Sequence, residues 1–140
     1  MARLEEGAME PSFRDIENGF VMNWYIPERE QGYWKTVPFI VGMDSAMGVG
    51  RDATTLVAID PVSLKTLFTW GSNEANITRV TEMVFQLMLK YPKMVLVPEA
   101  KASGISIIHG LCCLLEEKNI SPFTRIYNEI VQNKDDKTYD

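Results

Sequence analysis

One stretch, residues 39–59, constrains the fold more than any other part of the sequence. It reads FIVGMDSAMGVGRDATTLVAI: an apolar run leads to Asp44, a glycine-containing turn follows, and Asp52 opens a second apolar run. Apolar runs of this length between turn residues are typical of buried strands. We therefore predict a strand that ends at Asp44 and a tight turn at Gly48 and Gly50 that brings Asp52 back towards Asp44.

These two acids form a candidate cation site. A carboxylate at the mouth of a buried strand is costly unless it is paired or binds a metal. Two such acids without a nearby excess of Lys or Arg indicate a divalent cation. Taken singly, Asp44 is more simply a strand-end cap and Asp52 a turn residue, so the hypothesis depends on a further acid downstream.

Composition and charge limit the classes of protein to consider. The chain has 140 residues, 46% hydrophobic and 24% charged, which is ordinary for one globular domain. With 14 basic and 19 acidic residues its formal net charge is -5. This balance argues against nucleic-acid binding through a general basic surface. A nuclease stays possible, because metal ions can supply the positive charge at the site.

The cysteines and the hydropathy indicate a compartment. Cys112 and Cys113 are adjacent in a predicted helix, where neighbouring side chains point about 100° apart, so we expect free thiols rather than a disulfide. Free thiols fit a reducing compartment. We find no apolar segment long enough to cross a membrane and no signal peptide. The expectation is a soluble intracellular protein without a membrane partner.

Three regions follow from the pattern along the chain. We predict a connecting segment at residues 1–36, a folded domain at 37–131 and a polar tail at 132–140. Within the first region, residues 19–27 predict a short strand, and a turn-like segment follows it. Four large aromatic side chains there are expected to pack on the edge of the domain: Trp24, Tyr25, Tyr33 and Trp34.

The apolar pattern of the folded domain predicts a mixed sheet. Strands are expected at 38–43, 54–59 and 65–70 as an antiparallel meander, and at 94–98 and 123–127. Between them lie two helices with apolar stripes at helical spacing: Ile77, Val80, Val84, Leu87, Met88 and Tyr91 in the first, and Ile105, Ile108, Leu111, Cys112 and Leu115 in the second. The resulting order, β-β-β-α-β-α-β, is that of an α/β, ribonuclease H-like sheet with helices packed on it.

This order places a second acid beside the first. A strand entered from a helix is expected to run parallel to the first strand, so the ends of the first and fourth strands become neighbours. Asp44 ends the first of these strands and Glu99 directly follows the fourth. Lys101 comes two residues later, and Ser103 opens the next helix. A helix N-terminus with a nearby lysine is a natural phosphate contact, although Lys101 is equally well explained as a surface lysine.

Carboxylates in this arrangement suit metal-dependent phosphodiester hydrolysis. A two-metal site holds two hard cations about 3.5–4 Å apart. Asp44 would lie between two Mg²⁺ or Mn²⁺ ions, Glu99 would bind one of them, and Asp52 would be either a further ligand or an acid that contacts the ligands. Lys101 and Ser103 would contact a DNA phosphate. A solvated strand-end glutamate remains the simpler explanation of Glu99 taken alone.

Two segments resemble a known family. VGMDSAMGVGRDATT, residues 41–55, resembles the first acidic motif of the nuclease domain of phage terminase large subunits, and VPEAKASGISI, residues 97–107, is similar to the second. The resemblance covers about residues 38–127. It implies a metal-dependent endonuclease that cuts concatemeric viral DNA during packaging, in the cytoplasm of the infected host cell. It also implies double-stranded DNA, an ATPase domain of the parent chain, the portal and the small terminase subunit as partners.

One departure from the family bears on activity. The family has a third catalytic acid well downstream, whereas here Asp135, Asp136 and Asp140 lie in the polar tail and are not assigned to that role. We therefore expect a fragment without the C-terminal part of the domain and with an incomplete site. One alternative is a non-catalytic module of the same fold. Another is an actin-like ATPase relative, which should have a second phosphate hairpin and a much longer chain.

Overall fold

The computed structural model describes residues 13–17, 20–48, 51–74, 76–99, 101 and 103–132, with the side chains of 13–17, 20–21, 46–48 and 51–53 left out. The strands are β1 (Phe13–Glu17), β2 (Phe20–Trp24), β3 (Phe39–Gly48), β4 (Arg51–Ile59), β5 (Thr66–Ser72) and β6 (Met94–Pro98). The helices are α1 (Glu28–Gln31), the 3-10 helix η1 (Gly32–Lys35), α2 (Ile77–Lys90), α3 (Ser103–Glu117) and α4 (Pro122–Arg125).

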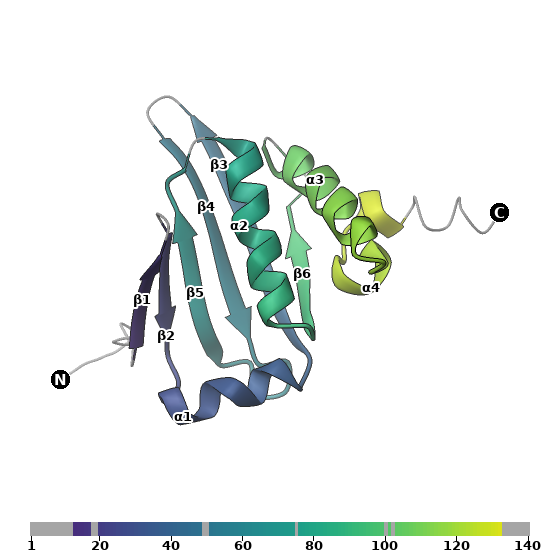
Figure 1. The fold of residues 1–140 in the computed structure, drawn as a ribbon. Helices are drawn as coiled ribbons and strands as arrows, with labels where there is room; N and C mark the ends of the chain where they lie inside the picture. The colour runs from purple at the N-terminus through teal and green to yellow at the C-terminus, as the bar shows by residue number, and fades with distance from the viewer. Residues whose placement is uncertain are drawn as a thin grey trace.

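The described strands form one six-stranded sheet in the order β1-β2-β5-β4-β3-β6. Every neighbouring pair is antiparallel except β3 and β6, which are parallel. Figure 1 shows α2 and α3 side by side over one face of this sheet. The sequence β3-β4-β5-α2-β6-α3 confirms the predicted ribonuclease H-like order up to the second helix. It also confirms that the first and fourth predicted strands are adjacent.

Side-chain alternation divides the sheet into a buried and an open face. On β3, Phe39, Val41 and Met43 are buried beneath the helices, as the period of two in a strand requires. The intervening positions face away from α2 and α3. On that second face three apolar side chains are 37–42% exposed: Ile40, Val57 and Val97.

The N-terminal segment is integral to the core. β2 pairs with β5, with Trp24 opposite Phe68, and the rings of these two residues lie 4.9 Å apart. Phe68 and Tyr91 also contact, and Phe39 joins Trp34 at 5.9 Å. The prediction of a strand within 19–27 is confirmed. Trp24 and Trp34 lie in the core rather than on its edge, because β2 and η1 bring them against the aromatic rings of the sheet.

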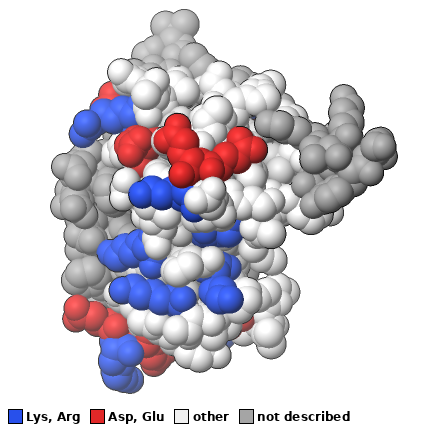
Figure 2. Space-filling model, turned by 45° about the vertical axis from the view of Figure 1, so that its right-hand side comes forward, with Lys and Arg blue, Asp and Glu red and all other residues white. Residues whose placement is uncertain are grey.

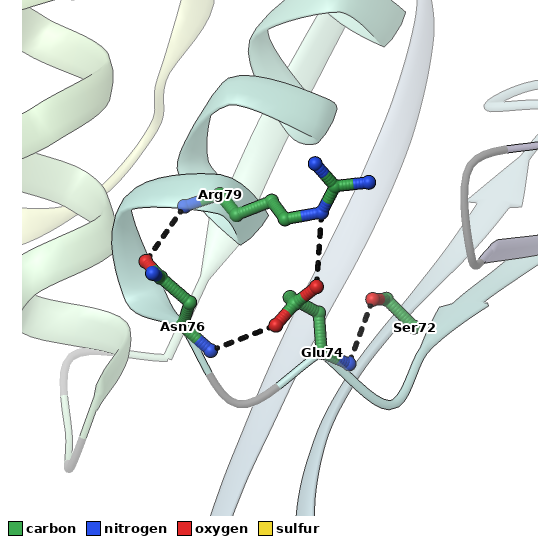
Figure 3. Close-up of polar contacts among 4 residues, drawn as sticks. All are labelled: Ser72, Glu74, Asn76 and Arg79. Atoms are coloured by element: carbon green, nitrogen blue, oxygen red, sulfur yellow. Dashed lines mark hydrogen bonds and ion pairs between the residues drawn. The ribbon is translucent and has the colours of Figure 1, made fainter.

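The start of α2 is fixed by polar contacts that Figure 3 shows. The Asn76 side chain accepts a hydrogen bond from the backbone amide of Arg79, a helix N-cap. Glu74 accepts from the backbone amide of Asn76 and forms an ion pair with Arg79 at 2.9 Å. The amide of Glu74 donates in turn to the Ser72 hydroxyl, which ties the cap to the end of β5. α2 ends at Lys90, just before Pro92, as predicted.

The buried stripe of α3 differs from the prediction at one position. Ile105 is 39% exposed, whereas Ile107 is fully buried. The buried arc includes Gly104, Ile107, Ile108, Leu111 and Leu115, each of which lies three or four residues from another member. Ile105 falls outside this arc. None of the helices within the described ranges has the length and apolarity that a membrane crossing requires.

The predicted strand at 123–127 is wrong for most of its length. The short helix α4 occupies Pro122–Arg125, and only Ile126 forms a parallel bridge, with Leu96 of β6. The physical reason is Arg125, which is 7% exposed. Its guanidinium donates to three backbone carbonyls at 2.8–3.0 Å: those of Met88, Tyr91 and Met94. Burial lowers the pKa of Arg125.

Candidate functional site

Asp44 lies just beyond the point where the pairing of β3 with its parallel neighbour β6 ends. The pairing of β3 with β6 ends at Met43 opposite Pro98, and β3 continues to Gly48. The strand therefore does not end at Asp44, because β4 pairs with β3 well beyond that residue, with Thr55 opposite Asp44. Asp44 is exposed and lies on the open face of the sheet. Its charge stays solvated, so the expected cost of burying it does not arise.

Glu99 continues the line of β6 by one residue. Its backbone amide donates to the carbonyl oxygen of Met43 at 3.2 Å, which holds the main chain of Glu99 next to Asp44. Both carboxylate residues line one open cavity of about 280 Å³. Thr55 and three residues of the open face, Gly42, Val57 and Val97, complete most of its wall. Strand adjacency thus brings these two predicted site residues together.

Lys101 and Ser103 lie in different environments. The Lys101 ammonium forms an ion pair with Glu99, with Nζ 3.2 Å from Oε2, and its side chain is 69% exposed. Ser103 is the first residue of α3 and is only 5% exposed, so little of it is available to a ligand. The phosphate contact predicted for both remains a prediction, and Lys101 is the one whose side chain is accessible for it.

Gly104 lets α3 begin close to Glu99. A Cβ at this position would overlap the backbone carbonyl oxygen of Glu99 and would lie 3.2 Å from the Ser45 hydroxyl oxygen. The Gly104 amide donates to the carbonyl of Lys101 at 2.9 Å. The loop between β6 and α3 is therefore compact because residue 104 lacks a side chain.

The backbone register separates Asp52 from Asp44. Asp52 pairs with Met47, three pairs beyond the Asp44–Thr55 pair and roughly 10 Å along the hairpin at the usual strand rise. The Asp52 side chain lies outside the described residues, as do Asp135, Asp136 and Asp140. The role of Asp52 as a ligand therefore stays a prediction.

The donor set decides what the described residues can hold. Within residues 13–132, apart from the parts left out, no group of three or more His, Cys, Asp or Glu side chains is placed to hold a metal ion. Two carboxylates on one open cavity fit a single hard cation whose remaining ligands are water molecules. They do not make up the ligands of a two-metal centre.

Sequence reasoning missed Thr55 and Arg125. Thr55 becomes a wall of the cavity through its register opposite Asp44, which requires the length of the hairpin to be known. Arg125 could have been identified only from contacts made 31 to 37 residues away in the sequence. His109 is exposed. Both cysteines are free, but only Cys112 is a core thiol, since Cys113 is exposed.

The charged side chains on the face that carries β6 and α3 are mixed in sign. Figure 2 shows a band of acidic side chains above a group of basic ones on this face. The described part of this face therefore lacks a continuous basic surface, in keeping with the net charge of -5. Any DNA contact on this face would need a local source of positive charge.

No family model and no curated protein matches the chain. Among solved structures it is similar to the large terminase nuclease of the thermophilic phage G20c, in forms with bound magnesium, with bound zinc and without either named. The sequence identity is 12–13% and the TM-score is 0.48. The similarity covers 90% of this chain but only 59–65% of the G20c chains.

Proposed function

We propose that this chain carries the metal-dependent endonuclease function of a viral DNA-packaging terminase and hydrolyses DNA phosphodiester bonds. The observation that supports the proposal best is the convergence of Asp44 and Glu99, 55 positions apart in the sequence, on one open cavity. Two exposed carboxylates on one cavity can supply oxygen ligands to a hard divalent cation, with water molecules as the remaining ligands. The acidic motifs around both residues support the same function.

In this proposal each residue has a defined task. Asp44 and Glu99 hold the cation, Mg²⁺ or Mn²⁺, which when bound supplies an activated water and polarises the scissile phosphate. Lys101 places its ammonium beside the phosphate and offsets its charge. Thr55 lines the cavity across from Asp44 and restricts the volume in which the phosphate lies. A full two-metal centre needs at least one further acid.

The proposed biological setting follows from the motifs. The DNA would be double-stranded and concatemeric, and cutting would take place in the cytoplasm of an infected host. An ATPase domain in the parent chain, the portal and the small terminase subunit would be the partners. The G20c proteins are described as nucleases of a large terminase.

A non-catalytic module of the same fold is the second candidate. It is favoured by the lack, among the described side chains, of a group of three potential metal ligands. The net charge of -5 also favours it, because weak DNA binding would limit turnover.

Nicking of supercoiled plasmid in Mn²⁺ separates the two candidates when it is combined with metal titration. A nuclease should nick slowly with Mn²⁺, not at all in EDTA, and not after Asp44→Asn. A module that has lost its chemistry should bind DNA or a partner equally well with and without metal. Plasmid that stays intact after prolonged incubation, together with no Mn²⁺ binding, would reject the nuclease function for this chain.

A further inference from the structure

Glu99 already has a cation next to it. The Lys101 ammonium lies 3.2 Å from the Glu99 carboxylate, and both side chains are more than half exposed. Among the ion pairs between described side chains, this is the one that includes a residue of the cavity wall. A divalent cation bound to Glu99 would therefore be repelled by the Lys101 ammonium, which contacts the same carboxylate.

We propose that Lys101 and the divalent cation compete for Glu99, and that a phosphodiester resolves the competition by accepting the lysine. This inference rests on the proposed function. A doubly charged ion and an ammonium a few ångströms apart repel each other even in water. A phosphate anion placed beside them attracts both. Metal and phosphodiester then bind with positive coupling, and the coupling is reciprocal by linkage.

The local structure lets Lys101 change partner. Its main chain is held, since the Lys101 carbonyl accepts the Gly104 amide at 2.9 Å at the start of α3. Its side chain is 69% exposed, so it can turn away from Glu99 without disturbing the core. An exposed ion pair of this kind contributes little to stability. The lysine therefore costs the fold little and is available to the ligand.

The consequence is a preferred order in which the site binds the phosphodiester and the metal. Without phosphodiester, Lys101 neutralises Glu99 and weakens metal binding. With phosphodiester present, the lysine moves to the phosphate and Glu99 becomes free for the metal. The site would then load its metal preferentially when DNA is in place, although the described acids on the cavity number only two.

The test is a titration of the 140-residue chain with Mn²⁺, followed by water-proton relaxation, with and without dimethyl phosphate as a phosphodiester that cannot report cleavage. Three variants are compared with the wild type: Lys101→Met, Lys101→Arg and Lys93→Met. Lys93 is an exposed lysine that immediately precedes β6, at the opposite end of that strand from Glu99, so it serves as the matched control.

We expect Lys101→Met to bind Mn²⁺ about three- to tenfold more tightly than the wild type when dimethyl phosphate is absent. Dimethyl phosphate should tighten Mn²⁺ binding more in the wild type and in Lys101→Arg than in Lys101→Met, where only the direct attraction between metal and phosphate remains. Lys93→Met should match the wild type. All four chains should unfold at the same temperature, which excludes a merely structural effect.

Two further results would overturn the inference, and they can be told apart. If the wild type binds Mn²⁺ and Asp44→Asn does not, but Lys101→Met has wild-type affinity, the competition does not exist although the metal site does. If no chain binds Mn²⁺ at all, the proposed metal-dependent function fails and the competition fails with it.

Discussion

The amide of Glu99 donates a 3.2 Å hydrogen bond to the carbonyl of Met43, the last residue of β3 that pairs with β6. This bond fixes the main chain of one candidate ligand relative to the residue that precedes the other. The two carboxylates are thus positioned by backbone pairing rather than by contacts between their own side chains. Substitutions of the carboxylates should therefore change ligand binding while leaving the fold intact.

Replacing Asp44 with asparagine is expected to weaken Mn²⁺ binding at least tenfold, because it removes one of two charged ligands from the cavity. The unfolding temperature should change little, since Asp44 is exposed. Isothermal titration calorimetry with Mn²⁺ measures the first effect and differential scanning calorimetry the second. Glu82→Gln, an exposed acid on α2, is the matched control and should bind like the wild type. Equal affinities in Asp44→Asn and Glu82→Gln would refute the site.

Gly104→Ala should displace Glu99, because the added Cβ overlaps the Glu99 carbonyl, a backbone atom that cannot rotate away. We expect faster amide hydrogen exchange at Glu99 and weaker Mn²⁺ binding. Gly110→Ala is the control on the same helix, where the new Cβ would meet the Thr81 methyl group at 2.8 Å, on α2 and away from the cavity. Both changes add a Cβ to α3, but only the first should alter exchange at Glu99. Identical exchange in the two variants would contradict the positioning role of Gly104.

Arg125→Met should destabilise the domain by about 2–4 kcal/mol, because it leaves buried carbonyls of Met88, Tyr91 and Met94 without their donor. Arg125→Lys should recover only part of this loss, since one ammonium cannot reproduce the fork of a guanidinium. Urea denaturation measures the free energy of unfolding. Arg29→Met, at an exposed position on α1, provides the comparison and should have almost no effect. A loss below about 0.5 kcal/mol would show that water replaces the guanidinium.

Asn76→Ala removes the N-cap of α2 and should cost about 1 kcal/mol. Asn76→Asp should retain the stability, because aspartate also caps helices and favours the positive end of the helix dipole. Thermal unfolding of the three chains side by side is the measurement. The interpretation would be wrong if the aspartate and alanine variants were equally destabilised.

The turn between β4 and β5 should contribute a pH-dependent increment of stability. The hydrogen bond from the Val62 amide, assisted by the Ser63 hydroxyl, lowers the pKa of Asp60 below its ordinary 3.8, although desolvation acts in the opposite direction. A carboxyl group whose pKa is lower in the folded state stabilises the fold above its unfolded pKa. That contribution is lost as the pH falls through the lower, folded value. The difference in unfolding temperature between the wild type and Asp60→Ala should therefore be largest above pH ~4 and shrink below it. A difference that stays constant down to strongly acidic pH would argue against this.

The neighbourhood of Asp44 and Glu99 could be predicted because it depends on element order alone. After three antiparallel strands and a helix, the next strand, β6, lies beside the first strand, β3, whatever the details of the loops. The exposure of Asp44 could not be predicted in this way. It depends on which face of the sheet α2 and α3 cover, and the apolar pattern of β3 does not state that. The length of β3 was also missed, because a strand continues for as long as one neighbour, here β4, still pairs with it.

Long-range polar contacts account for the other differences. Nothing around Arg125 in the sequence indicates that its guanidinium meets the end of α2, since its acceptors are backbone carbonyls common to every residue. The same holds for β1, whose pairing with β2 follows from the backbone and not from an apolar pattern. Ile105 and Ile107 were exchanged because either fits an apolar stripe until the helix is placed on its neighbour.

The pairing of β2 with β5 means that residues 20–24 cover the edge of β5, which could otherwise pair with a strand of another chain. A protein that begins at residue 37 would expose the backbone donors and acceptors of β5 to solvent and uncover the ring of Phe68 beside them. Bare strand edges with apolar neighbours are sites of intermolecular sheet growth. Such a shortened protein should form soluble oligomers or precipitate at concentrations where the 140-residue chain stays dispersed. Residues 20–24 should thus affect colloidal behaviour as well as the packing of the core.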